Sequence, residues 1–253
     1  MSSGGRVGRD SPYTSRGCDM IWYTTEEVCV ILGRFSQILL VGDSMLRHII
    51  GAINILIRED LGYGAVTDWN FNQAERSVKY HTQPYETIPQ QRFTNCFGKL
   101  VEQINRFPIP NDELMRLRAS VHASQMEGSS KPSAFILGHG LWNNLEIEAS
   151  IHWLDSVLSV INREADFQAP TLLVTPNAAG KDKPDRWLMT QGNEALVRFE
   201  EVMADAAIEQ GIDHLGTWNM SIQATLYDGV HLDMRGNLLK AMMVVNWLAL
   251  LSD

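Results

Sequence analysis

The chain has 253 residues, a length that fits one large domain or two small ones. Its content of 45% hydrophobic and 20% charged residues is ordinary for a globular protein with a sizeable core. The net charge of −9 argues against nucleic-acid binding and against electrostatic docking on anionic membranes. No apolar run approaches the length of a membrane span.

Residues 1–17 are rich in Gly, Ser and Arg, and we expect a disordered lead there, followed by a single domain over residues 18–253. This lead lacks the hydrophobic segment of a secretory signal, so the chain as written predicts no signal peptide. The three cysteines, Cys18, Cys29 and Cys96, form no CxxC or Cys/His cluster that would suggest zinc. The odd number leaves at least one thiol free, and the sequence leaves open whether a disulfide forms.

The first predicted elements are a helix, a strand and a second helix. A capping box that begins at Thr24 predicts the start of the first helix. Residues 38–41 form a short, apolar, β-branched run typical of a buried parallel strand. Gly42 and Asp43 interrupt this run, and from Ser44 onward the apolar residues recur at helical spacing. Ser44 is therefore predicted to lie where a strand turns sharply into a helix.

The rest of the chain alternates between predicted strands and helices. A glycine-flanked turn at residues 61–66 leads into a second strand, and the polar residues 67–92 are expected to wall a cleft or form a lid. Residues 97–106 predict a short helix. Further strands are expected at 134–137, 171–174 and 212–215, and further helices at 112–125, 146–165, 192–210 and 234–251.

This alternation predicts an α/β fold, a three-layer α/β/α sandwich with a mostly parallel sheet of about five strands. Ser44 would then stand at the carboxyl edge of the sheet, where open α/β folds bind ligands. The N-terminus of the following helix would direct N–H groups at developing negative charge. Acyl transfer needs both an exposed nucleophile and such donors. The alternative is that the segment is only a turn with a helix cap.

A serine nucleophile needs a base, and the base needs an orienting acceptor. Of the seven histidines, His231 alone has an aspartate three residues earlier, Asp228, in a predicted loop before a helix. In a loop this spacing lets the carboxylate approach Nδ1 while Nε2 faces a serine. The alternative is that Asp228 and the following glycine form a plain turn. His48 and His152 fall in predicted helices and are expected to be structural, whereas His139 follows a strand and is a candidate for ligand contact.

An oxyanion hole needs fixed donors near the serine. The candidates are the N–H of Ser44, a glycine N–H from the turn near the second strand, and the side-chain amide of Asn143. Because Asn143 follows a predicted strand, its side chain is expected to project over the same sheet edge as Ser44. The alternative for Asn143 is a helix cap, since it precedes a predicted helix.

Together these residues resemble the SGNH, or GDSL-like, hydrolase superfamily over residues 18–251. The Gly-Asp-Ser block at residues 42–44 matches its nucleophile motif, and residues 228–231 match its C-terminal Asp-x-x-His block. Residues 140–143 are similar to a variant of its third block. The fit is closer to the PC-esterase-like branch, which includes fungal glycan O-acetyl esterases and acetyltransferases and extends its first block with an arginine, here Arg47.

The resemblance implies that Ser44 is the nucleophile, His231 the base and Asp228 its orienter. The implied activity is that of a serine esterase that removes a small acyl group, acetyl above all, from a hydroxyl-rich substrate through an acyl-serine intermediate. No metal or cofactor is required. Two alternatives stay open: an acyltransferase or biosynthetic cyclase that uses the same acyl-enzyme, and a catalytically silent glycan-binding module.

The resemblance also implies an oxyanion hole formed by Ser44, a glycine of the second block and Asn143. That glycine is Gly62 or Gly64, with Gly62 favoured. The third block departs from the common pattern, because Asn144 stands where the motif has aspartate.

Three further residues are candidates for substrate binding: Arg47, His139 and Trp142. The expected substrate is a small-molecule or carbohydrate ester, with no nucleic acid as a partner and with the oligomeric state open.

Members of the resembling branch are usually secreted and disulfide-bonded, whereas the sequence as written predicts a cytoplasmic protein. The compartment therefore stays open.

Overall fold

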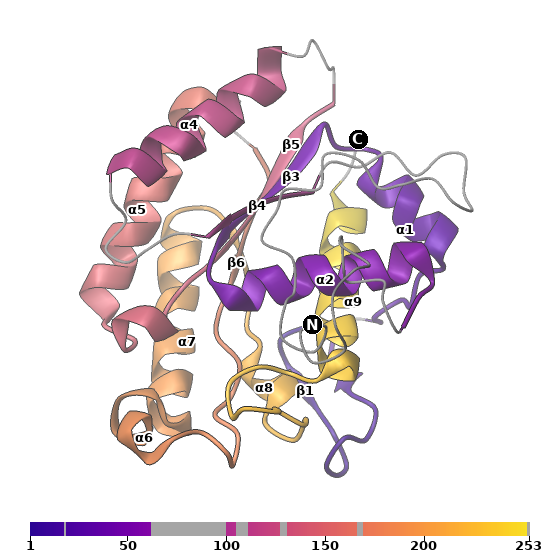
Figure 1. Ribbon diagram of the computed structural model, residues 1–253, viewed down its shortest axis with the longest axis vertical. Coiled ribbons are helices and arrows are strands. Elements are labelled where there is room, and N and C mark those ends of the chain that lie inside the picture. The colour runs from indigo at the N-terminus through magenta and orange to yellow at the C-terminus, as the bar shows by residue number, and fades with distance from the viewer. Residues whose placement is uncertain (18, 62–99, 105–110, 127–130, 166–168, 252–253) are drawn as a thin grey trace, which may run out of the picture.

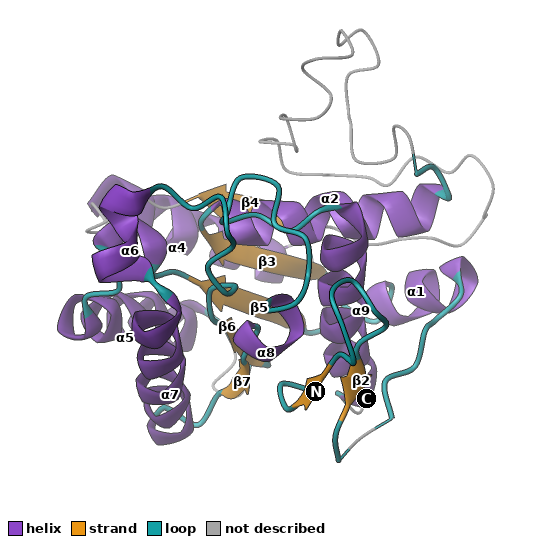
Figure 2. Cartoon of the chain, turned by 90° about the horizontal axis from the view of Figure 1, so that it is seen from below, coloured by secondary structure: helices purple, strands orange, loops and turns teal. Residues whose placement is uncertain are grey.

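The computed structural model places the chain around one parallel sheet (Figures 1 and 2). It describes residues 1–17, 19–61, 100–104, 111–126, 131–165 and 169–251. The five strands of the sheet are, in spatial order, β4 (Leu100–Ile104), β3 (Gln37–Gly42), β5 (Ser133–Gly138), β6 (Thr171–Val174) and β7 (Asp213–Leu215). All of these pairings are parallel, so the carboxyl ends of the strands meet at one edge.

Helices pack on both faces of the sheet, which confirms the predicted three-layer α/β/α sandwich (Figure 1). One face is covered by α1 (Thr25–Leu32), α2 (Ser44–Arg58) and α9 (Met234–Leu250). The other face is covered by α4 (Asn111–Met126), α5 (Ile147–Glu164) and α7 (Asn193–Glu209). The shorter elements are β1 (Gly4–Gly5), β2 (Thr14–Ser15), η1 (Leu141–Asn143), α6 (Asp185–Gln191) and α8 (Trp218–Ser221).

Strand β3 lies in the interior of the sheet, and all six of its residues are buried. Successive side chains of a strand point to opposite faces, and here both faces are apolar. Ile38 and Leu40 belong to the core under α1, α2 and α9. Leu39 and Val41 belong to the core under the opposite layer of helices. The unbroken apolar run in the sequence is therefore the consequence of a strand covered on both sides.

One predicted element is wrong, and others lie outside the described residues. The helix expected at residues 97–106 is instead strand β4, which pairs in parallel with β3 from Ile38 to Gly42. A short segment with few apolar residues has weak periodicity, and the exposed edge of β3 supplies the backbone partners that decide its state. The turn and strand expected after residue 61 and the polar segment 67–92 lie outside the described residues.

Residues 1–17, for which the composition predicts a disordered lead, make specific contacts with the body of the fold in this structure. Arg6 donates from Nε to the carbonyl of Met220 at 3.3 Å. Asp10 accepts from the backbone N–H of Thr225 at 2.7 Å and from its hydroxyl at 2.8 Å. Polar side chains of the lead therefore satisfy backbone groups more than 200 residues away in sequence.

Cys29 is disulfide-bonded, which settles a point that the sequence left open. The other two cysteines lie outside the described residues.

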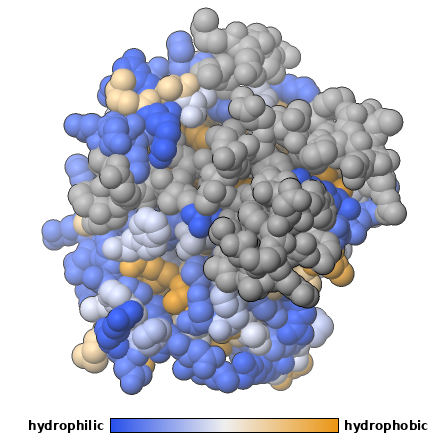
Figure 3. Space-filling model, in the orientation of Figure 1, coloured by the Kyte–Doolittle hydropathy of each residue, from blue (hydrophilic) through white to orange (hydrophobic). Residues whose placement is uncertain are grey.

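Within the part of the chain that the structure describes, no helix is long and apolar enough to cross a bilayer. On the face drawn in Figure 3, most of the described side chains are hydrophilic.

Candidate active site

The turn between β3 and α2 is the sharp strand-to-helix connection that the sequence predicts. Asp43 caps α2, and its side chain accepts from the backbone N–H of Met45 at 2.9 Å. Gly42 must be glycine, because a Cβ there would collide with the carbonyl oxygen of Gly138 on the neighbouring strand. Ser44 is the first residue of α2 and so stands at the carboxyl edge of the sheet.

A tight loop before α9 carries the predicted base. Its ends are joined by an antiparallel bridge between Leu226 and Leu232, and the N–H of Tyr227 donates to the carbonyl of His231 at 3.0 Å. Gly229 has a φ of 79°, in the left-handed region that favours glycine. The loop therefore has a fixed shape.

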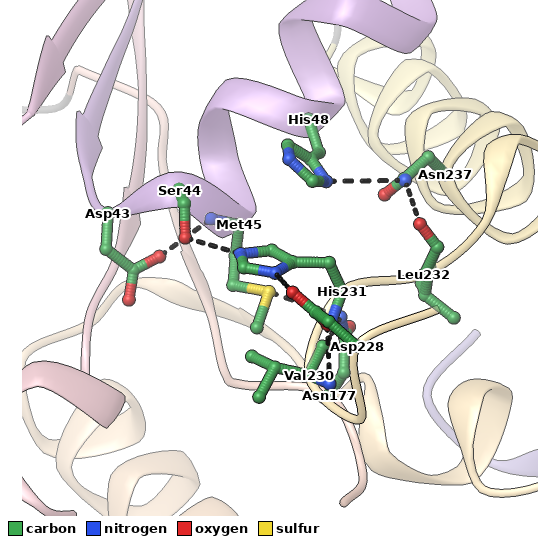
Figure 4. A network of polar contacts seen from close by, with 10 residues as sticks. All are labelled: Asp43, Ser44, Met45, His48, Asn177, Asp228, Val230, His231, Leu232 and Asn237. Atoms are coloured by element: carbon green, nitrogen blue, oxygen red, sulfur yellow. Dashed lines mark hydrogen bonds and ion pairs between the residues drawn. The ribbon is translucent and has the colours of Figure 1, made fainter. Parts of the chain in front are cut away.

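Ser44 and the distant pair Asp228 and His231 come together at this edge (Figure 4). The hydroxyl of Ser44 lies 2.7 Å from Nε2 of His231, across 187 residues of chain. Nδ1 of the same imidazole lies 2.6 Å from Oδ2 of Asp228. The predicted convergence is present, and it forms a continuous chain of hydrogen bonds from carboxylate to imidazole to hydroxyl.

The carboxylate of Asp228 is held in its ionised form. Burial acts to raise its pKa, but hydrogen bonds from the side chain and backbone of His231 and from the backbone of Val230 lower the pKa to about 2. Oδ1 accepts those backbone N–H groups at 2.7 Å from His231 and 2.9 Å from Val230. An ionised acceptor at Nδ1 favours the tautomer in which Nε2 is free to accept the hydroxyl proton of Ser44.

His48, which the sequence predicts to be structural, borders this site, and its contact with His231 was not predicted. Its ring centroid lies 4.7 Å from that of His231, with an angle of 38° between the planes (Figure 4). Burial lowers the pKa of His48 to about 3, and the charge of the protonated His231 acts in the same direction. A neutral ring therefore packs beside His231. The signal in the sequence was its position four residues after Ser44, one helical turn along the same face.

The side-chain amide of Asn143 has hydrogen-bond partners near the start of α5 in this structure. Its Nδ2 lies 2.8 Å from the hydroxyl of Ser150 and 3.2 Å from the carbonyl of Glu146, so both of its N–H groups are used near the start of α5. Its role as an oxyanion donor stays a prediction. Gly62 and Gly64 lie outside the described residues.

The three residues predicted to bind substrate have different environments. Arg47 lies on α2, and its charge acts on the ionisation of His48. His139 is only 7% exposed and stacks on Trp153 at a centroid distance of 5.0 Å. Burial lowers the pKa of His139 to about 4, so its ring is neutral near pH 7. Trp142 in η1 is 52% exposed and is available to an external ligand. Their contact with substrate stays a prediction.

Within the described ranges, no group of three or more His, Cys, Asp or Glu side chains is arranged to hold a metal ion.

No family model matches the chain, and no curated protein matches it in sequence. Among solved structures, the chain is similar to a carbohydrate acetylesterase from Sinorhizobium meliloti, with 15% identity, a TM-score of 0.49, and coverage of 85% of this chain and 100% of that chain. It is also similar to a member of the lipolytic G-D-S-L family from Veillonella parvula DSM 2008, with 13% identity, a TM-score of 0.44, and coverage of 85% and 97%.

A carbohydrate acetylesterase family member from Sinorhizobium meliloti is similar as well, with 11% identity, a TM-score of 0.47, and coverage of 84% of this chain and 98% of that chain. Proteins named for the G-D-S-L family and for carbohydrate acetylesterases are thus among the structures similar to this chain. The resemblance to the fungal branch stays a prediction.

Proposed function

We propose that the chain is a serine esterase that removes a small acyl group, acetyl above all, from a hydroxyl-rich substrate. The observation that carries this proposal is the hydrogen-bonded chain Ser44–His231–Asp228, with heavy-atom distances of 2.7 Å and 2.6 Å. Both distances fall within the reach required for proton transfer between a nucleophile and its base.

In the first half of the reaction, the hydroxyl oxygen of Ser44 bonds to the ester carbonyl carbon while Nε2 of His231 takes its proton. The tetrahedral intermediate then collapses, the carbon–oxygen bond to the alcohol breaks, and the imidazolium returns the proton to the departing oxygen. Asp228 stays ionised and stabilises the imidazolium. Water, activated by His231, then attacks the acyl-serine and releases the acid.

The negative charge on the tetrahedral intermediate needs donors that are fixed in advance. Ser44 is the first residue of α2, where backbone N–H groups have no acceptor within the helix and the helix dipole favours an anion. We assign its N–H as the first donor and propose Gly62 and Asn143 as the other two, the amide of Asn143 by exchanging its contact with Ser150 or Glu146 for the oxyanion. Arg47, His139 and Trp142 are proposed to contact the alcohol part of the substrate.

The test is hydrolysis of p-nitrophenyl acetate by the wild type and by the variant Ser44→Ala. We expect the loss of the nucleophile to reduce kcat by a factor on the order of 10⁴ or more, with the circular dichroism spectrum unchanged. The matched control is Ser159→Ala, which removes an exposed hydroxyl from α5 and should leave the rate unchanged.

A fluorophosphonate probe supplies a second measurement that does not depend on the choice of ester. The wild type should be labelled at Ser44, and Ser44→Ala should not be labelled. Full turnover by Ser44→Ala, or a folded wild type that neither hydrolyses the ester nor reacts with the probe, would contradict the proposal.

A further inference from the structure

A lysine is buried behind the candidate active site. Lys240 on α9 is only 1% exposed, in a helix whose other inward-facing residues are mainly apolar. Lysine is almost never fully buried unless its charge is compensated, because removing an ammonium group from water is costly. The proposed mechanism does not use this residue, so its presence calls for another explanation.

Neighbouring groups offset part of the cost of burying the charge of Lys240. Its Nζ donates to Oδ1 of Asn177 at 3.1 Å. Burial lowers the pKa of Lys240 to about 8, and the negative charges of Asp43 and Glu200 act in the opposite direction. Asp43 is itself 3% exposed and precedes Ser44 directly. Burial raises the pKa of Asp43, and the N–H of Met45 and the charge of Lys240 oppose that rise.

Asn177 connects this cation to the loop that carries the base. Its Nδ2 donates to the carbonyl of Val230 at 3.3 Å, directly before His231 (Figure 4). Its Oδ1 is also 3.2 Å from the hydroxyl of Thr217, and Asn177 is 3% exposed. The amide is therefore held in one orientation, because the ammonium group of Lys240 can only donate, so the amide oxygen faces it and the nitrogen is left to face Val230.

We propose that Lys240 is a positioning residue that fixes His231 relative to Ser44. Its ammonium group orients the amide of Asn177, whose Nδ2 contacts both the carbonyl of Val230 before His231 and the sulfur of Met45 after Ser44. One buried cation thus connects the turn that carries the hydroxyl with the loop that carries the imidazole. This inference rests on the proposed esterase function, in which that distance sets the rate of proton transfer.

The experiment compares Lys240→Met, which keeps most of the side-chain volume and removes the charge, with a matched core variant. The control is Met243→Ala, a fully buried position on the same helix that belongs to the apolar core. Both variants should lower the melting temperature. At a temperature where both are folded, we expect Lys240→Met to reduce kcat for p-nitrophenyl acetate roughly 10- to 100-fold while KM stays within about twofold. Met243→Ala should keep its kcat.

A second variant and a second measurement make the result independent of folding and of turnover. Asn177→Ala should reproduce the loss of kcat, because it breaks the same connection to Val230. The NMR signal of the Nδ1 proton of His231, which lies in the hydrogen bond to Asp228, should shift or broaden in both variants and keep its position in Met243→Ala.

The outcomes separate this inference from the proposed function. If Lys240→Met and Asn177→Ala keep the wild-type kcat and the wild-type imidazole signal, Lys240 only stabilises the fold and the inference is overturned. If the wild type neither hydrolyses esters nor reacts with the probe, but the imidazole signal still moves in Lys240→Met, the esterase assignment fails and the positioning role stands.

Discussion

The ionisation state of Asp228 determines whether His231 can serve as a base at this site. The carboxylate accepts one side-chain and two backbone N–H groups, and these hydrogen bonds keep its pKa at about 2. It is therefore charged across the whole range in which an imidazole titrates. In the proposed mechanism, such a partner fixes the orientation of the ring and stabilises the imidazolium that forms when Ser44 loses its proton.

Asp228→Asn should remove this stabilisation with little change of shape. We expect kcat for p-nitrophenyl acetate to fall by a factor on the order of 10³ to 10⁴, since an amide favours the wrong imidazole tautomer. Steady-state kinetics at pH 7 would measure this fall. A variant that keeps a tenth or more of the wild-type rate would exclude Asp228 as the orienting group.

The same group makes a prediction about stability against pH. The pKa of Asp228 in the folded chain, about 2, lies below its ordinary value of 3.8, so ionised Asp228 stabilises the fold above pH 4. That contribution is lost as the pH falls from about 4 through 2. Urea unfolding of the wild type and Asp228→Asn should therefore give free energies that differ most at pH 5 and converge near pH 2.

At the scale of elements, the loop from Leu226 to Leu232 sets the geometry of the candidate site as much as any single side chain does. Gly229 packs against the backbone of Lys183, and its carbonyl accepts from the N–H of Gly180 at 2.9 Å. The loop is therefore held between the bridge at its ends and the segment that follows β6. This close backbone approach is possible only because residue 229 has no Cβ.

Gly229→Ala tests that constraint, and Gly211→Ala is its control. Both glycines have a positive φ, 79° and 68°, but only at Gly229 would a Cβ collide with a neighbouring backbone, that of Lys183. Gly211→Ala should cost about 1 to 2 kcal/mol of unfolding free energy and leave kcat unchanged. Gly229→Ala should cost more, and kcat should fall because the loop must move. Equal effects of the two variants in urea unfolding and kinetics would contradict this account.

The elements were predictable where their sequence patterns were strong. The buried strand before Ser44, the strands at 134–137 and 171–174, and the long helices near 146–165 and 234–251 all recur in the structure. Strand β4 was not predictable, because its state is decided by pairing with the edge of β3. The contacts of Asn143 were equally hidden, since its amide donates to the hydroxyl of Ser150 in α5 and to the carbonyl of the N-cap residue Glu146.

At the scale of the whole molecule, the first residues of the chain stabilise the segment that leads to the base. Asp10 accepts both the N–H and the hydroxyl of Thr225, directly before the loop that carries His231. The hydroxyl of Thr225 is the first cause of the lowered pKa of Asp10. The lead is therefore hydrogen-bonded to the residue directly before the loop that carries His231.

Asp10→Ala should lower the melting temperature by a few degrees, because the N–H and the hydroxyl of Thr225 lose their acceptor. Asp19→Ala, at an exposed position of the same part of the chain, is the control and should leave the melting temperature unchanged. Differential scanning calorimetry of the two variants would measure the difference. Equal melting temperatures of Asp10→Ala and Asp19→Ala would show that Asp10 contributes nothing to the stability of this part of the fold.

The sequence by itself determined the α/β layering and the three candidate residues Ser44, Asp228 and His231. Apolar periodicity and the Gly-Asp-Ser and Asp-x-x-His spacings are local properties that a chain carries before it folds. Only the tertiary structure decided that the hydroxyl and the imidazole lie 2.7 Å apart, and that the buried Lys240 lies behind them. Those facts depend on the packing of α2 and α9 against one face of the sheet, and no local pattern records which distant residues that packing brings together.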